Sequence, residues 1–240
     1  MKRTLCLLLV VCMLLTPIPS VALPANSVTV ADYESLRTAL TTSANGTIVQ
    51  LNGSFSFSNS ITVTNSLILD LNGHTLTFTG TDPERKLLIS GILFTGSGTF
   101  TVKDSGTDGK LITSETYSMA MSNEGSGMLD LAGGSVTANQ EMSCAIVNVG
   151  SGTIRLTGAR VASEKFYAVI NQLTAGRLYM TGGTVSSDVE YGLVNYGSAE
   201  IAGGTVSSNT SHGVMNLGNG AVLTISGGTV TSTALSLIHM

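Results

Sequence analysis

The chain has 240 residues, with 11 basic and 15 acidic side chains, so its formal net charge is −4 and a nucleic-acid partner is not expected. Only 11% of the residues are charged, while glycine is abundant at 28 residues. This composition argues against long helices and favours a chain of strands and turns.

The first 22 residues have the features of a signal peptide. Lys2 and Arg3 precede an apolar run over residues 5–15, and Ser20 and Ala22 supply the small side chains of a cleavage site. The alternative, a single membrane anchor, needs a longer apolar run than these eleven residues. We therefore expect a secreted or cell-surface protein without a membrane span after cleavage, in which nine basic residues remain against fifteen acidic ones.

Residues 23–45 are expected to form an N-terminal cap, a short strand followed by an amphipathic helix within residues 28–43. Asp32 is placed to cap the start of this helix. An open solenoid end exposes its core and its unpaired strands, so the helix is expected to cover the first coil. Apolar side chains follow one face of the helix at Tyr33, Leu36, Ala39 and Leu40.

Residues 46–234 are expected to form one parallel β-helix. Between residues 47 and 116 the predicted strands are separated by longer turns, and from residue 129 onward one phrase recurs five times. Its closing valines are 25, 24, 21 and 24 residues apart, a period that predicts a solenoid. The copies are Leu-Ala-Gly-Gly-Ser-Val at 131–136, Leu-Thr-Gly-Ala-Arg-Val at 156–161, Met-Thr-Gly-Gly-Thr-Val at 180–185, Ile-Ala-Gly-Gly-Thr-Val at 201–206 and Ile-Ser-Gly-Gly-Thr-Val at 225–230.

Alternating apolar and polar residues before each glycine pair predict strands with one buried face. Stacking the copies places two apolar columns inside: Leu129, Ile154, Leu178, Ala199 and Leu223 in the first, and Leu131, Leu156, Met180, Ile201 and Ile225 in the second. The row between them is expected to face water, with an ion pair between its first two members: Asp130, Arg155, Tyr179, Glu200 and Thr224.

A second phrase recurs between these copies and ends in asparagine. Asn148, Asn171, Asn195 and Asn216 are predicted to stack as a structural ladder of hydrogen-bonded amides. In the same strands both alternating rows are apolar: Ile146, Val169, Leu193 and Val214 in one, and Val147, Ile170, Val194 and Met215 in the other. Because only one row can point inward, the other is a candidate contact surface for a partner; the alternative is that a turn or neighbouring domain covers it.

These patterns together predict an all-β fold, a single-stranded right-handed parallel β-helix of about seven coils of 21–31 residues, with an N-terminal amphipathic capping helix. Residues 235–240 depart from the repeat. They are either a genuine short tail or a translated sequencing-library adaptor, in which case the natural protein continues past Thr233.

The repeats resemble right-handed β-helix proteins of the pectin-lyase-like superfamily, and more closely its non-catalytic, adhesin-like secreted bacterial members. The resemblance covers roughly residues 46–234, and residues 69–76, Leu-Asp-Leu-Asn-Gly-His-Thr-Leu, also look like such proteins. It implies a fold without implying one activity, because that superfamily includes lyases, hydrolases and adhesins.

Candidate functional side chains lie on the turns that follow each glycine pair. Counting from the valines places Asn139, Glu164, Asp188 and Asn209 in one column, and Tyr167, Tyr191 and His212 in another. Oxygen ligands from Glu164 and Asp188 could share a Ca²⁺ ion, and the tyrosines could stack on sugar rings. The alternatives are exposed carboxylates without a ligand and aromatic rings that face the core. The ligand-binding candidates are Glu164, Asp188, Glu190, Tyr167, Tyr191, Tyr179 and Arg155.

No motif for nucleophilic catalysis, phosphate binding or a zinc site occurs, and we assign no catalytic residue. Cys144, the cysteine left after cleavage, is interpreted as a small packed residue. The leading hypothesis is a non-catalytic, secreted or cell-surface domain for adhesion or glycan contact, whose partner is an extracellular polysaccharide or a host or cell-surface protein. The alternatives are a polysaccharide lyase or glycoside hydrolase of the pectin-lyase-like class and a structural stalk.

Overall fold

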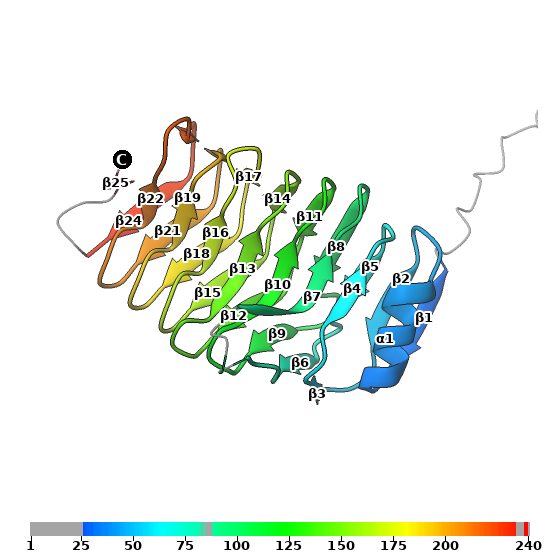
Figure 1. Ribbon diagram of the computed structural model, residues 1–240. Coiled ribbons are helices and arrows are strands. Elements are labelled where there is room, and N and C mark those ends of the chain that lie inside the picture. Colours follow the sequence, from blue (N-terminus) through cyan, green and yellow to red (C-terminus); the bar gives the residue numbers. More distant parts are fainter. Residues whose placement is uncertain (1–25, 83, 85–87, 234–237, 240) are drawn as a thin grey trace, which may run out of the picture.

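The structure is a computed structural model that describes residues 26–82, 84, 88–233 and 238–239. The predicted signal peptide lies outside the described residues, as does most of the tail at 235–240. Within the described part the chain is a parallel β-solenoid with one helix, and its strands stack as rungs along the rod (Figure 1).

Three parallel sheets form the walls of the solenoid, and we call them A, B and C. The described strands of sheet A are β1 (Ser27–Val30), β2 (Ile48–Leu51), β5 (Ile68–Asp70), β8 (Thr99–Lys103), β11 (Met128–Leu131), β14 (Thr153–Leu156), β17 (Arg177–Met180), β20 (Ser198–Ile201) and β23 (Val222–Ile225). Those of sheet B are β3 (Phe55–Phe57), β6 (Thr75–Phe78), β9 (Lys110–Thr113), β12 (Ser135–Ala138), β15 (Arg160–Ser163), β18 (Thr184–Ser187), β21 (Thr205–Ser208) and β24 (Thr229–Ser232). Those of sheet C are β4 (Ile61–Val63), β7 (Ile89–Phe94), β10 (Ser118–Asn123), β13 (Cys144–Asn148), β16 (Val169–Asn171), β19 (Leu193–Asn195), β22 (Val214–Asn216) and β25 (Ile238–His239).

The described strands make about eight turns, so the predicted number of seven is wrong. The first coil, β2 to β4, has no Gly-Gly phrase, so the repeat does not reveal it as a separate coil. Coil lengths also vary more than predicted: Ile48 pairs with Ile68, and Ile68 pairs with Thr101, which gives steps of 20 and 33 residues. At ~4.8 Å per rung, eight steps make a rod about 40 Å long.

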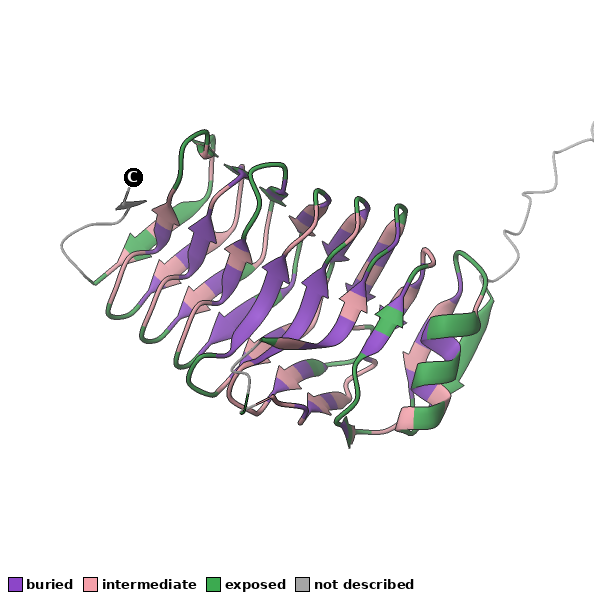
Figure 2. Ribbon diagram, viewed as in Figure 1, coloured by how far each residue is buried: buried purple, intermediate pink, exposed green. Residues whose placement is uncertain are grey.

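The register of sheet A confirms both predicted columns, but Ile225, at the end of the second column, is 42% exposed, so the expectation that it lies inside is wrong. Leu129 pairs with Ile154, which pairs with Leu178, and the column continues through Ala199 to Leu223. These side chains belong to one continuous apolar core, and Figure 2 shows its buried positions alternating along the strands. The chain then turns toward sheet B where the second glycine of the pair adopts a positive φ between 74° and 81°, at Gly134, Gly183, Gly204 and Gly228.

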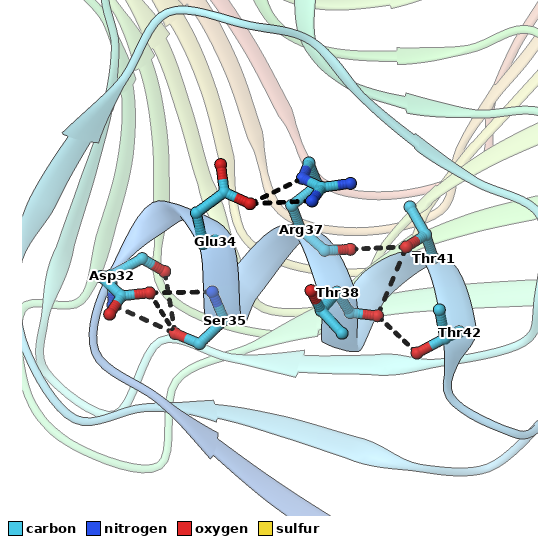
Figure 3. A network of polar contacts seen from close by, with 7 residues as sticks. All are labelled: Asp32, Glu34, Ser35, Arg37, Thr38, Thr41 and Thr42. Carbon is cyan, nitrogen blue, oxygen red and sulfur yellow. Dashed lines mark hydrogen bonds and ion pairs between the residues drawn. The ribbon is translucent and has the colours of Figure 1, made fainter.

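The predicted capping helix is present as α1 (Tyr33–Thr42), which lies against the first coil. Asp32 accepts a hydrogen bond from the backbone N–H of Ser35 at 2.8 Å, and the Ser35 hydroxyl accepts one from the N–H of Asp32, which makes a capping box (Figure 3). Leu36, Ala39 and Leu40 are buried beneath the helix. No described helix is long and apolar enough to cross a bilayer.

Candidate functional site

A polar pocket of about 250 Å³ opens on the outer face of sheet B. At the beginning of the strands it is lined by Lys110, Ser135 and Arg160, which stand in register on β9, β12 and β15. At the other end, just after the strands finish, it is lined by Asn139, Glu164 and Asp188. The pocket therefore has cations at one end and carboxylates at the other, with Ile112, Thr137 and Ala162 side by side between them.

The predicted column after the sheet B strands is formed because Ser163, Ser187 and Ser208 are in register, so the residues that follow them also stack. Asn209 donates a hydrogen bond from Nδ2 to Oδ1 of Asp188 at 2.8 Å. Glu164 has no ion pair among the described residues, and its carboxylate is solvent-exposed.

Asn139 supplies an acceptor that the protein does not satisfy. Its Oδ1 atom is buried and has no hydrogen-bond partner among the described residues. A buried amide oxygen without a donor is costly, since it has given up its contact with water. Asn139 lines the pocket, so a rotation of its side chain that exposed Oδ1 would let a ligand hydroxyl or an ion restore the missing interaction.

Glu190 does not line this pocket. Its backbone N–H is held by the Ser187 hydroxyl at 2.9 Å, and its charge acts on Tyr167, on the side of sheet C. Among the described residues no group of three or more His, Cys, Asp and Glu side chains could hold a metal ion. Glu164, Asp188 and the amide oxygen of Asn139 could supply part of the six to eight oxygen ligands that Ca²⁺ takes, with water completing the shell.

Tyr167, Tyr191 and His212 form the predicted aromatic column, and it lies outside the main core. The rings of Tyr167 and Tyr191 are stacked with centroids 5.4 Å apart, and the His212 ring is 5.6 Å from that of Tyr191. Phe166 packs against Tyr167 with a centroid distance of 3.9 Å. Because Tyr167 stacks on Tyr191 and also packs against Phe166, much of its ring face is already in contact with protein, which leaves less of it for a sugar.

The outward row of sheet A has the predicted register but one member is not exposed. Asp130 is only 5% exposed, because Arg155 covers its carboxylate with two hydrogen bonds, Nε to Oδ1 at 2.9 Å and Nη2 to Oδ2 at 2.8 Å. The expectation that Asp130 faces water is therefore wrong. Its hydrogen bond raises the pKa of the Arg155 guanidinium, which is engaged in this pair. Tyr179, 37% exposed, and the exposed Glu200 follow on the next two rungs.

The asparagines predicted to form a ladder are hydrogen-bonded in register. Asn148 donates from Nδ2 to Asn171 Oδ1 at 2.8 Å, Asn171 to Asn195 at 2.8 Å, and Asn195 to Asn216 at 2.6 Å. The first three are fully buried, and each also donates to a backbone carbonyl of the turn that follows its strand. The ladder thus satisfies buried turns, a structural role.

Lys110 and Arg160 were not predicted as site residues from the sequence, and Asn139 was placed in the column of Glu164 and Asp188 but not among the ligand-binding candidates. Arg160 carries the signal that could have revealed it: the corresponding rungs hold Ser135 and Thr184, so the cation breaks the small polar repeat. The role of Lys110 depends on a register across a 25-residue coil that has no Gly-Gly phrase before it.

The sequence matches no protein-family model, and no similar protein was found among curated proteins or among solved structures. The structure therefore defines the class of this protein by its architecture, as a parallel β-solenoid.

Proposed function

We propose that this protein is an exported, non-catalytic β-solenoid that contacts glycans through the polar pocket on sheet B. The observation that carries the proposal is the pocket itself, where Lys110 and Arg160 face Glu164, Asp188 and the unsatisfied amide of Asn139. Sugars carry many hydroxyl groups, each of which can donate and accept hydrogen bonds. The basic side chains of the pocket can donate to them, and the carboxylates and the amide oxygen can accept from them. The sheet fixes the backbone positions of these residues, while the exposed side chains of Lys110, Arg160 and Glu164 become ordered on binding.

The export and the relationship belong to the same proposal. The signal-peptide features of residues 1–22 support secretion or display at the cell surface. The repeats resemble the adhesin-like members of the pectin-lyase-like superfamily, and the parallel stacking supports that relationship. We also propose the right-handed coil that parallel crossovers adopt in nearly all proteins.

A second candidate function is cleavage of a polysaccharide, as a lyase or glycoside hydrolase. It is favoured by one observation, that the carboxylates of Glu164 and Asp188 line the same pocket as two basic side chains. Paired carboxylates are the usual machinery of glycoside hydrolysis, and Ca²⁺ bound there could hold an acidic sugar.

The test combines binding and product release. Purified protein without residues 1–22 is applied to a panel of neutral and acidic polysaccharides with and without Ca²⁺, and both retention and the appearance of unsaturated or reducing ends are followed. Glycan contact predicts retention without product. Product that disappears in Glu164→Gln or Asp188→Asn would show that the protein is an enzyme. If the protein is not retained and no product forms, the remaining hypothesis is a structural stalk.

A further inference from the structure

The outer face of sheet C carries an apolar row that the main core does not use. The inward row, Ile146, Val169, Leu193 and Val214, is fully buried in that core. The second row is Val147, Ile170, Val194 and Met215, in register from β13 to β22. We call this second row, with the side chains around it, the sheet C apolar face.

This face has its own packing. Val147 belongs to a small separate cluster with Met119 and Cys144, and Phe166, Tyr167 and Ile170 pack against it. The cluster explains why Figure 2 shows β10 and β13 buried along their whole length, although only one of their faces contacts the main core. The face is therefore a built surface, already partly dehydrated before any partner arrives.

A groove of about 380 Å³ runs over the row. Val147, Ile170 and Val194 form its floor, since they are successive rungs; Val147 and Val194 are only 2% and 3% exposed, and Ile170 is half-buried, so Ile170 is the floor residue most open to a partner. Leu88 and Tyr167 lie at the end where the strands begin, and Gln172 and Tyr196 at the end where they finish. The floor is aliphatic, while the tyrosine hydroxyls and the amide of Gln172 provide polar groups at the edges.

Four exposed apolar side chains, Leu88 in the groove and three outside it, lie at the ends of the sheet C strands. Leu88, Met142 and Val189 precede β7, β13 and β19, and Leu173 follows β16; they are 37–45% exposed. These four are half of the eight large exposed hydrophobic side chains in the described part of the chain. An apolar surface this much wider than the groove fits a macromolecule better than a small ligand.

Charges indicate the chemistry of the partner. The Glu124 carboxylate accepts a hydrogen bond from the Ser122 hydroxyl at 3.0 Å, and Ser122 is the rung beside Val147. Glu190 lies near Tyr167, and Glu141 is on the turn before β13. Lys165, exposed on the turn before Phe166, is a cation in the same region.

The described charges around the face are thus mainly acidic, and two copies meeting there would bring like charges together. We propose that the sheet C apolar face is a docking surface for a protein segment that presents a row of apolar side chains flanked by Lys or Arg. The groove takes the apolar row, and the acidic rim attracts the cations. This surface is separate from the pocket on sheet B, so the proposal does not depend on glycan binding.

A peptide display library selected on the purified protein tests the proposal. The selected peptides are then measured on Ile170→Thr and on a matched control, Ile68→Thr, which changes an equally half-buried outward isoleucine on sheet A, away from both the groove and the sheet B pocket. We expect peptides rich in Leu, Ile or Phe beside Lys or Arg, whose affinity falls about tenfold or more in Ile170→Thr and stays unchanged in the control.

The double variant Glu124→Gln, Glu190→Gln keeps the apolar row and removes two rim charges. We expect it to weaken the same peptides and to reduce the dependence of their affinity on salt. The proposal is overturned if no selected peptide distinguishes Ile170→Thr from the control, or if the peptides that do are not enriched in Lys and Arg. It is also overturned if the unmixed protein is a dimer that Ile170→Thr dissociates.

Discussion

Replacing Asn171 by alanine is expected to be among the most destabilising changes in the chain. Its amide donates to Asn195 Oδ1 at 2.8 Å and to the Gly176 carbonyl at 3.0 Å, and its Oδ1 accepts from Asn148 at 2.8 Å. Each such bond contributes about 1 kcal/mol net, and each buried group left without a partner costs about 1–3 kcal/mol. We therefore expect Asn171→Ala to lower the free energy of unfolding by about 3–5 kcal/mol.

The end of the same ladder provides the control. Asn216 is half-buried; its Nδ2 donates to the Ala221 carbonyl at 3.4 Å, and its Oδ1 accepts from Asn195 at 2.6 Å. Asn216→Ala should therefore cost about 1–2 kcal/mol, because Asn195 keeps the Gly197 and Val222 carbonyls as acceptors. Urea unfolding of the two variants, followed by circular dichroism, measures both. Equal losses in the two variants, or a loss in Asn171→Ala below about 0.5 kcal/mol, would refute the idea that the buried ladder stabilises the coils.

Three further outcomes are expected. Burial of the Asp70 carboxyl opposes its charge, but hydrogen bonds from Ser105 and Lys103 outweigh burial and lower its pKa. The ionised carboxylate therefore stabilises the fold above the usual Asp pKa of about 3.9, and this stability is lost as pH falls through the lower pKa of the folded state. A urea midpoint that falls as steeply below pH 4 in Asp70→Asn as in the unchanged protein would contradict this. Cys144 is buried, which raises the pKa of its thiol, so a thiol reagent should react with it in urea far faster than in buffer; equal rates would count against its packed position. Asp32→Ala should lower the urea midpoint through loss of the cap, and an unchanged midpoint would argue against it.

The repeated part of the fold was predictable because the register of each strand can be read from its own copy of the repeat. Alternation fixed which side chains face inward, and the glycine pair fixed where each strand ends, so the columns of sheet A follow from spacing alone. The first coil could not be counted in this way. It has no glycine pair, and its presence depends on the pairing of Ile48 with Ile68.

The candidate site was predictable only in part, for a related reason. The column of Glu164 and Asp188 follows from the repeat, whereas the cations at the opposite end depend on a long-range register. The burial of Asp130 shows a different limit. Alternation correctly places Asp130 on the outer face. Its carboxylate is nevertheless shielded from water by the side chain of Arg155, one rung away, which alternation does not reveal.

The measurement that tests the central claim most directly compares glycan affinity in two matched variants. Arg160→Thr introduces the residue type of the next rung, Thr184, and removes a cation from the pocket. Arg177→Thr makes the same change on sheet A, where the adjacent rung is Thr153, and leaves the pocket intact. For any glycan that the protein retains, isothermal titration should show about a tenfold loss in Arg160→Thr and none in Arg177→Thr. Equal affinities in the two variants would contradict the assignment of the sheet B pocket.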